Sequence, residues 1–520
     1  MDTRKQIKFG AILSYLQIAL GAVITLIYTP FIIRVLGQSE YGLYNTVASV
    51  VSSLSILSLG FGSCYVRFFS RYKAANQEDD VANLNGMFMT IFLVIGVVAL
   101  FCGLFLSNHL EYVFDKGLTT EELNTAKILM TLLTINLALS FPFSVFSSII
   151  TANEKFIFQK CVLLFKQVAS PLVCIPLLLM GYASVGMVIS TVTIYILMDI
   201  INATFCIRKL KARFVFGHFD KNLFKEMAVY SGFIAINMIV DQINLNIDKF
   251  LLGRYKGTTS VAIYSAGYTL YHYYMTFSTS ISNVFIPRVH HIWSNLKDTA
   301  EQKNQKLSVL FSFVGRIQFI ILLLVCSGLV LFGKQFIIRW AGVDYGNAYY
   351  VVLLLAISAI TPLSQNVGIE IQRAKNKHQF RSILYAAMAI INLVLSIFLC
   401  QLYGEIGSAI GTAISFIIAN TIAMNIYYYK ALQINVKLYW TRCIRCFIAA
   451  IPAFAVGYFL CLVMDTYKWL YMLIGIAIYS IAYGACEFLF ATSKEERNSI
   501  IAAVNKRLKI GRQEKVDDSK

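Results

Sequence analysis

The stretch MFMTIFLVIGVVALFCGLFLS, residues 87–107, decides the class of fold. It contains no charged side chain, and about 20 apolar residues are enough for an α-helix to cross the hydrocarbon core of a membrane. Similar runs recur along the chain, so that 58% of its 520 residues are hydrophobic and only 14% are charged. Soluble domains carry about 25% charged residues. The sequence therefore predicts an all-α, polytopic integral membrane protein.

About 14 segments satisfy the same length rule. They cover residues 9–33, 42–66, 87–107, 126–149, 159–180, 183–207, 225–252, 260–285, 308–332, 347–369, 382–402, 406–428, 443–463 and 468–490. A polar tail, residues 493–520, follows the last segment. An even number of spans places both termini on the same side of the membrane.

The formal net charge of +18 would suggest a nucleic-acid partner in a soluble protein. Here the Lys and Arg residues concentrate in the short loops on the side of the two termini, and few lie in the opposite loops. Cytoplasmic loops of membrane proteins carry this excess. We therefore predict that both termini are cytoplasmic, and we expect no nucleic-acid partner.

The chain also repeats itself, which predicts two six-helix lobes with the same orientation in the membrane, as in transporters with parallel repeats. The matched positions lie 216, 220 and 221 residues apart: Gly37 with Gly253, Pro142 with Pro362, and Gly186 with Gly407. The predicted parts are an N-terminal lobe (1–222), a C-terminal lobe (223–430), two additional helices (431–492) and the cytoplasmic tail (493–520).

Pro142 and Pro362 lie at equivalent places in the two lobes. A proline inside a helix removes one backbone hydrogen bond and favours a kink, and neighbouring groups or water can satisfy the freed carbonyl in a membrane. Kinked helices at matched places suit a cavity wall that bends. An inherited kink without a moving part explains the same pattern.

Four polar residues interrupt the apolar run 225–252 at spacings of 4, 3 and 4, which place them on one face of a helix. A carboxylate that faces lipid costs about 2.5–3.5 kcal/mol on insertion scales. The face therefore lines either a water-filled cavity between the lobes or a set of interhelical hydrogen bonds. Two acidic members favour the cavity. The four residues are Asn237, Asp241, Asn244 and Asp248.

Six basic residues lie inside or at the ends of the predicted spans, and each alone can extend to the interface. Together they would give the cavity a positive lining suited to phosphate. Asp199 and Glu370 are acids within the spans that could pair with these bases. The six are Lys166, Arg316, Arg34, Arg67, Arg71 and Arg373.

Motifs of common enzyme classes are absent from the sequence. It contains no G-x-x-x-x-G-K-[ST] phosphate loop and no H-E-x-x-H zinc motif. The loops between spans are about 20 residues at most, which is short for a catalytic domain. Cys443 and Cys446 form a single C-x-x-C without a second pair, which favours packing over a metal site. We therefore predict neither an enzyme, nor a metal site, nor a cofactor.

Several segments together resemble the flippases of bacterial polysaccharide biosynthesis. These are KFGAILSY (8–15), PFIIRVLGQSEYGLYN (30–45), SLGFGSCYVRF (58–68), DKFLLG (248–253) and AIYSAGY (262–268). Such flippases belong to the multidrug/oligosaccharidyl-lipid/polysaccharide exporter superfamily, and the resemblance covers residues 5–490.

The resemblance implies two six-helix lobes around a central cavity that opens alternately to either side of the membrane. It also implies an undecaprenyl-pyrophosphate-linked oligosaccharide as substrate, moved from the inner to the outer leaflet of the bacterial plasma membrane. The six basic residues are then candidates for binding the pyrophosphate. Asp241 or Asp248 is a candidate for coupling transport to H⁺ or Na⁺.

The expected partners are the lipid-linked oligosaccharide, membrane lipids, and the polymerase and glycosyltransferases of the same pathway. Two other functions fit the sequence less well. A drug or metabolite antiporter of the same superfamily would leave the basic residues unexplained. A membrane scaffold for glycan-assembly enzymes that transports nothing would leave the two acids unexplained.

Overall fold

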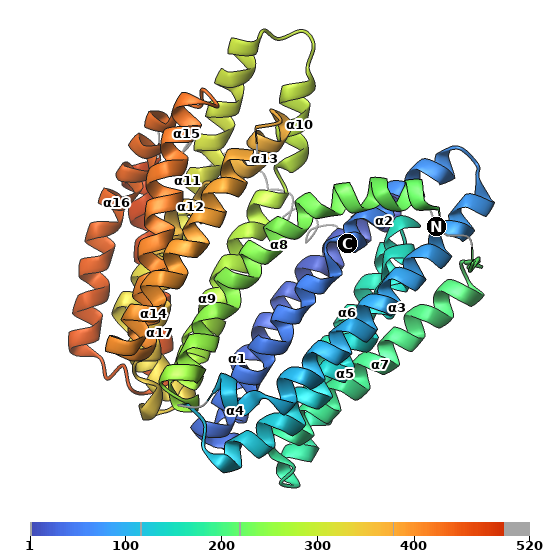
Figure 1. The fold of residues 1–520 in the computed structure, drawn as a ribbon. Coiled ribbons are helices and arrows are strands. Elements are labelled where there is room, and N and C mark those ends of the chain that lie inside the picture. Colours follow the sequence, from blue (N-terminus) through green and yellow to red (C-terminus); the bar gives the residue numbers. More distant parts are fainter. Residues whose placement is uncertain (1–2, 115–116, 218–219, 378, 493–520) are drawn as a thin grey trace, which may run out of the picture. The chain divides into compact units, whose positions relative to one another are not determined.

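The computed structural model describes residues 3–114, 117–217, 220–377 and 379–492. All regular secondary structure within these ranges is helical (Figure 1), which confirms the predicted all-α fold. The predicted tail 493–520 lies outside the described residues.

The first half of the chain contains seven α-helices and one short 3-10 helix in its described residues. These are α1 (Thr3–Ser53), the 3-10 helix Leu54–Ser58, α2 (Phe61–Ala74), α3 (Glu78–Asn108), α4 (Leu110–Val113), α5 (Thr120–Ala152), α6 (Phe156–Leu179) and α7 (Ala183–Arg208). Helices α3, α5, α7, α6 and α1 form a chain of neighbours in which each packs against the next (Figure 1).

The second half begins at α8 and ends in two further long helices. Its elements are α8 (Lys221–Tyr255), α9 (Thr258–Asn283), α10 (Ile286–Ser294), α11 (Ala300–Ala341), the 3-10 helix Val343–Tyr345, α12 (Ala348–Ser364), α13 (Val367–Ala374), α14 (Gln379–Phe416), the π-helical stretch Ile417–Ala423, α15 (Met424–Lys430), α16 (Val436–Val463), α17 (Trp469–Cys486) and the π-helical stretch Glu487–Ala491.

Ten segments of the described chain are long and apolar enough to cross a membrane. Two of them are pairs of helices joined at a bend, one at Gly37 and one at Gly404. Helices α8 and α9 have 35 and 26 residues but are not among the ten, because polar residues interrupt their apolar runs. When each bent segment is counted as two helices, the ten segments contain 12 helices. With α8 and α9 the number is 14, as predicted.

Several helix boundaries differ from the sequence prediction. The expected span 42–66 is interrupted at Leu59 and Gly60, which have left-handed φ values of 47° and 73°. The expected span 260–285 ends at Asn283, because Pro287 occupies the first turn of α10, where its missing N–H costs no hydrogen bond. The expected span 347–369 ends at Ser364, shortly after Pro362.

The backbone repeats its turns at a constant distance along the chain. Glu154 and Asn376, which follow the ends of α5 and α13, have left-handed φ values of 56° and 53°. Lys211 and Gln433, which follow α7 and α15, both have φ of 53°. Each pair is 222 residues apart, as are the helix ends Ala152 and Ala374. The predicted internal repeat is therefore present in the backbone.

By its internal contacts the described chain divides into two compact units. The first comprises the described parts of 1–277, 340–355 and 379–419, and the second those of 278–339, 356–378 and 420–520. The core of the first unit includes a run of buried rings, Tyr65, Phe88, Phe92 and Phe141, with successive centroids 5.0–6.5 Å apart. The predicted boundary between lobes at residue 222 was derived from the sequence repeat, whereas these units are defined by contacts. That boundary therefore stays a prediction.

Candidate functional site

Asp248 lies at the centre of a buried polar cluster in the first unit. Its side chain is 1% exposed. Its Oδ1 accepts hydrogen bonds from Ser396 Oγ (2.9 Å) and Ser408 Oγ (2.7 Å). Its Oδ2 accepts from Tyr264 OH (2.6 Å) and Thr412 Oγ1 (2.7 Å). Four hydroxyl donors therefore replace the water that a carboxylate loses on burial.

The amide of Asn392 completes this cluster, which we call the Asp248 cluster: Asp248, Tyr264, Asn392, Ser396, Ser408 and Thr412. Asn392 Oδ1 lies 3.2 Å from Ser396 Oγ and 3.1 Å from Thr412 Oγ1. The hydroxyls of Ser396 and Thr412 each carry a single hydrogen, for which the oxygens of Asp248 and Asn392 compete. The cluster thus concentrates seven oxygen atoms of six side chains from α8, α9 and both segments of α14.

The rest of the predicted polar face of α8 has different surroundings. The side chain of Asp241 is exposed, and Arg381 of α14 is the charged group that acts on it. Asn244 is half-buried, and its Oδ1 has no hydrogen-bond partner within the described residues. The side chain of Asn237 lies outside the described part of the structure. For Asp248, the predicted water-lined face is wrong, because α9 and α14 enclose its carboxylate.

Lys166 of α6 is paired with Asp199 of α7, as the sequence suggested. Their Nζ and Oδ1 atoms are 3.2 Å apart, and the two side chains are only 20% and 19% exposed. The ammonium also lies 4.2 Å from the centroid of the Tyr195 ring. This arrangement satisfies a cation within the apolar segments without extension to the interface.

Three further basic residues of the first unit are exposed. Arg71 Nη1 lies 3.3 Å from both carboxylate oxygens of Glu226. The guanidinium of Arg67 lies 4.7 Å from the centroid of the Tyr230 ring. Arg34, near the bend of α1, is also exposed. All three remain accessible to an anionic ligand.

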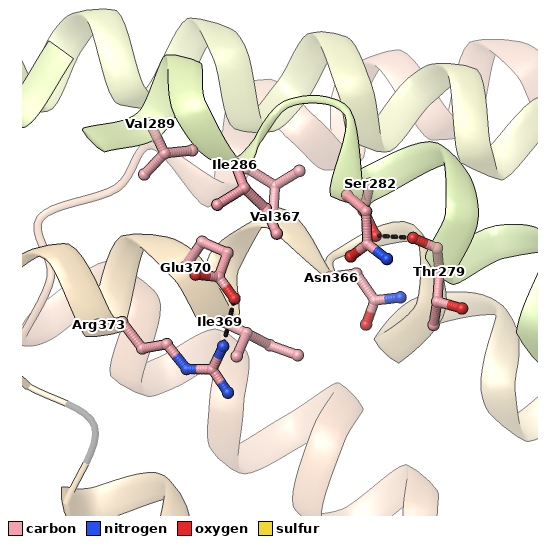
Figure 2. A pocket seen from close by; sticks show the side chains of 10 residues that line it. Thr279, Ser282, Ile286, Val289, Asn366, Val367, Ile369, Glu370 and Arg373 are labelled. Atoms are coloured by element: carbon pink, nitrogen blue, oxygen red, sulfur yellow. Dashed lines mark hydrogen bonds and ion pairs between the residues drawn. The ribbon is translucent and has the colours of Figure 1, made fainter. Parts of the chain in front are cut away.

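Arg373 lines a small cavity in the second unit, of about 170 Å³, between the end of α9, α10 and α13. Figure 2 shows its guanidinium directed to Glu370, with Nη1 and Oε1 2.6 Å apart. The other carboxylate oxygen lies 3.8 Å from His290 Nε2. Glu370 thus pairs with a base, as predicted. A phosphate at Arg373 would have to compete with this carboxylate.

Arg316 lies in the middle of α11, also in the second unit. Its charge acts on Glu487 and on Cys446, which belong to the last π-helical stretch and to α16. Glu487 is a buried acid that the sequence analysis did not single out. Arg316 therefore faces the additional C-terminal helices.

The two matched prolines have different local structures. Pro142 lies inside the continuous helix α5, and a Cβ added at Gly96 of α3 would lie 2.6 Å from Ala138 O and 3.6 Å from Pro142 Cδ. The α3 backbone thus packs closely against this stretch of α5. Pro362 lies two residues before the end of α12. A role of either proline in bending stays a prediction.

Sequence reasoning missed the hydroxyl partners of Asp248. Asn392 and Ser396 are four residues apart, as are Ser408 and Thr412, so each pair lies on one face of a helix. Small hydroxyl residues are frequent at helix contacts in membranes. The spacing alone was a usable signal, but it does not indicate which helix lies opposite.

Comparison with known proteins identifies the family. Residues 8–293, more than half of the chain, match the family described as "Polysaccharide biosynthesis protein". A Shigella flexneri protein named "Putative O-antigen transporter" is 24% identical over 406 residues, which are 76% of this chain and 92% of that protein.

Solved structures show the same fold. A structure of the lipid II flippase MurJ in an inward closed conformation has a TM-score of 0.64 at 17% identity and covers 93% of this chain and 98% of its own. An inward-facing multidrug resistance MATE transporter of the MOP superfamily also has a TM-score of 0.64, at 14% identity, and covers 81% of this chain and 99% of its own. This multi-pass membrane protein therefore belongs to the polysaccharide biosynthesis protein family.

Proposed function

We propose that this protein is a flippase that moves a polyprenyl-pyrophosphate-linked oligosaccharide from the cytoplasmic to the outer leaflet of the bacterial plasma membrane. The observation that carries the proposal is the family match over residues 8–293. The similarity to a protein named as an O-antigen transporter supports the same substrate class. The transporter fold over 93% of the chain supports translocation rather than catalysis.

The charged head of such a substrate needs cations and water, whereas its polyprenyl tail stays in lipid. Exposed Arg34, Arg67 and Arg71 are suited to attract the pyrophosphate, because guanidinium groups bind phosphate oxygens bidentately. Lys166 and Arg373 would exchange their carboxylate partners for phosphate, and Arg316 is the remaining candidate. The exchange replaces one anion by another and keeps each cation paired.

We further propose that Asp248 or Asp241 couples transport to H⁺ or Na⁺. The Asp248 cluster offers carboxylate, amide and hydroxyl oxygens, which are suitable ligands for a hard cation such as Na⁺. Asp241 is exposed, and we propose that it is the acid of the pair that protons reach. A dependence of transport on Na⁺ would favour Asp248, and a dependence on pH alone would favour Asp241.

Leaflet-specific labelling of the lipid-linked oligosaccharide in intact cells tests the main proposal. Cells without this protein should accumulate the labelled glycan on the inner leaflet, and expression of the protein should restore its outer-leaflet pool. An unchanged distribution between leaflets would contradict the proposal. The same assay with Asp248→Asn and Asp241→Asn, at equal expression, tests coupling.

A drug or metabolite antiporter remains the second candidate, because the MATE structure is as similar in fold as the flippase structure. Export of cationic dyes from vesicles that contain only this protein would favour it. A scaffold for glycosyltransferases and a polymerase predicts loss of glycan assembly, with no change in the leaflet where completed substrate resides.

A further inference from the structure

A second, larger cavity lies in the first unit, away from the Asp248 cluster. Its volume is about 610 Å³, within the range of about 300–1,000 Å³ that is usual for small-molecule sites. It lies where α2 ends, α3 begins and α5 ends, and the segment after α7 completes its wall. We call it the α3 cavity. Its lining residues are Phe69, Lys73, Asn76, Gln77, Glu78, Val81, Ala82, Asn85, Ile149, Asn153, Leu210, Lys211, Ala212 and Arg213.

The segment after α7 is fixed onto α3 by specific contacts. Val215 N donates to Ala82 O at 3.1 Å, and Asn85 Nδ2 donates to Arg213 O at 2.8 Å. Gly86 permits this approach, since a Cβ there would lie 1.9 Å from Val215 O. This wall of the cavity is therefore held in place by hydrogen bonds and close packing, although it is a connection between helices.

The corresponding place in the second half has the same backbone turns but is occupied by side chains. Lys375 stands 222 residues after Asn153, and its Nζ donates to Asn304 Oδ1 (2.6 Å) and to Leu432 O (2.5 Å). Its ammonium also lies 5.2 Å from the Trp293 ring. A lysine side chain and an indole thus occupy the space between the turns. The fold does not itself require an open cavity at this place.

Basic side chains dominate the charges of the α3 cavity. Lys73, Lys211 and Arg213 are its cations, and Glu78 is its one acid. Lys73 Nζ donates to Asn153 Oδ1 at 2.8 Å, a neutral partner. Within the described residues, neither Lys211 nor Arg213 has an ion-pair partner. The cavity therefore carries an uncompensated positive charge.

We propose that the α3 cavity binds a phosphate-bearing ligand, with its phosphate between Lys73, Lys211 and Arg213. Phosphate oxygens accept several charge-assisted hydrogen bonds at once, which suits one guanidinium and two ammonium groups. Phe69, Ile149 and Leu210 offer apolar contacts to the rest of the ligand. The headgroup of an anionic lipid and a soluble phosphate compound share this chemistry.

The lipid source is tested on the full-length protein by native mass spectrometry after incubation with phosphatidylglycerol. Lys211→Gln/Arg213→Gln should lower the bound lipid at least about tenfold, since hydrogen bonds to charged groups are strong. The matched control is Arg208→Gln/Lys209→Gln, which removes the same charge from the adjacent, exposed end of α7. This control should bind as the wild type does.

The soluble source is tested by the rise in unfolding temperature with inorganic pyrophosphate at constant ionic strength. The rise should be lost in Lys211→Gln/Arg213→Gln and kept in the control. Glu78→Gln removes the single acid and should tighten binding in whichever arm is positive. The unfolding temperature of each variant without ligand shows whether that variant folds. If the double variant Lys211→Gln/Arg213→Gln does not fold, the single variant Lys211→Gln takes its place.

A positive lipid arm identifies a headgroup site, and a positive pyrophosphate arm identifies a soluble ligand. The proposal is wrong if neither probe distinguishes the cavity variant from the wild type. It is equally wrong if the control variant loses as much binding as the cavity variant, since the effect is then one of general surface charge.

Discussion

The phenol of Tyr264 on α9 donates a 2.6 Å hydrogen bond to the Asp248 carboxylate on α8. Both side chains are almost completely buried, at 2% and 1% exposure. A buried acceptor of this kind is costly to leave without donors. The contact therefore joins two consecutive helices through a group whose loss should lower stability, apart from any effect on the ion coupling proposed above.

Asp248→Asn should lower the free energy of unfolding by about 1–3 kcal/mol, because the amide nitrogen cannot accept from the hydroxyls that now donate to the carboxylate. Asp241→Asn makes the same chemical change on the same helix at an exposed side chain, and should stay within about 0.5 kcal/mol of the wild type. Thermal unfolding in detergent measures both. Equal losses in the two variants would contradict the structural difference between these acids.

Lys166→Met should destabilise the protein, because it leaves Asp199 without its cation. Removing one partner of a fully buried pair costs about 3–5 kcal/mol. We expect less here, since each side chain is about one-fifth exposed. The double variant Lys166→Met/Asp199→Leu should recover most of the loss. A double variant less stable than Lys166→Met would show that Asp199 has a different principal partner.

Gly86→Ala should displace the segment after α7, because the new Cβ would lie 1.9 Å from Val215 O. Its unfolding temperature should fall, as is usual for overpacked sites that cost about 1–3 kcal/mol. Gly62→Ala in α2 serves as the control, since no atom lies within 4 Å of its added Cβ. The control should be neutral or slightly stabilised by better helix propensity. The comparison fails if both variants unfold at the wild-type temperature.

Stability should rise with pH where Lys375 titrates. Burial lowers the pKa of its ammonium from the ordinary 10.5 to about 8, and the nearby Lys377 acts in the same direction. Between these two values the unfolded chain binds more protons than the folded one, so the free energy of unfolding increases with pH. Lys375→Met should flatten this rise between pH 8 and 10, as measured by unfolding temperature.

Lys430→Met is the matched control for that measurement, because Lys430 is an exposed residue at the end of α15. It should keep the wild-type dependence on pH. An identical profile for the wild type and Lys375→Met would mean that other groups determine the rise.

The helical architecture could be read from the sequence because it follows from a length requirement. Apolar runs of about 20 residues specify spans whatever they pack against. The breaks inside these runs were less visible. Pro287 marks the start of α10 and was a usable signal. Leu59, by contrast, adopts a left-handed conformation, and a leucine in the sequence gives no indication of one.

The polar residues were found more easily than their surroundings. Asp241 and Asp248 are seven residues apart, so the helical period places them on the same face. The period does not reveal that α14 and α9 cover one position and leave the other open. For the same reason, the sequence indicated that Asp199 and Glu370 pair with basic residues but did not indicate which base pairs with which acid. Glu487, which lies near Arg316, was missed.

The turns at Glu154 and Asn376, and at Lys211 and Gln433, kept one backbone geometry while the residues between them diverged. After a gene duplication, such a pair of inherited turns provides the same backbone arrangement at two places in the chain. One copy can be filled to strengthen the bundle, and the other can be left open for a new ligand. If the α3 cavity binds a ligand as proposed, this chain acquired an additional recognition site without altering its topology.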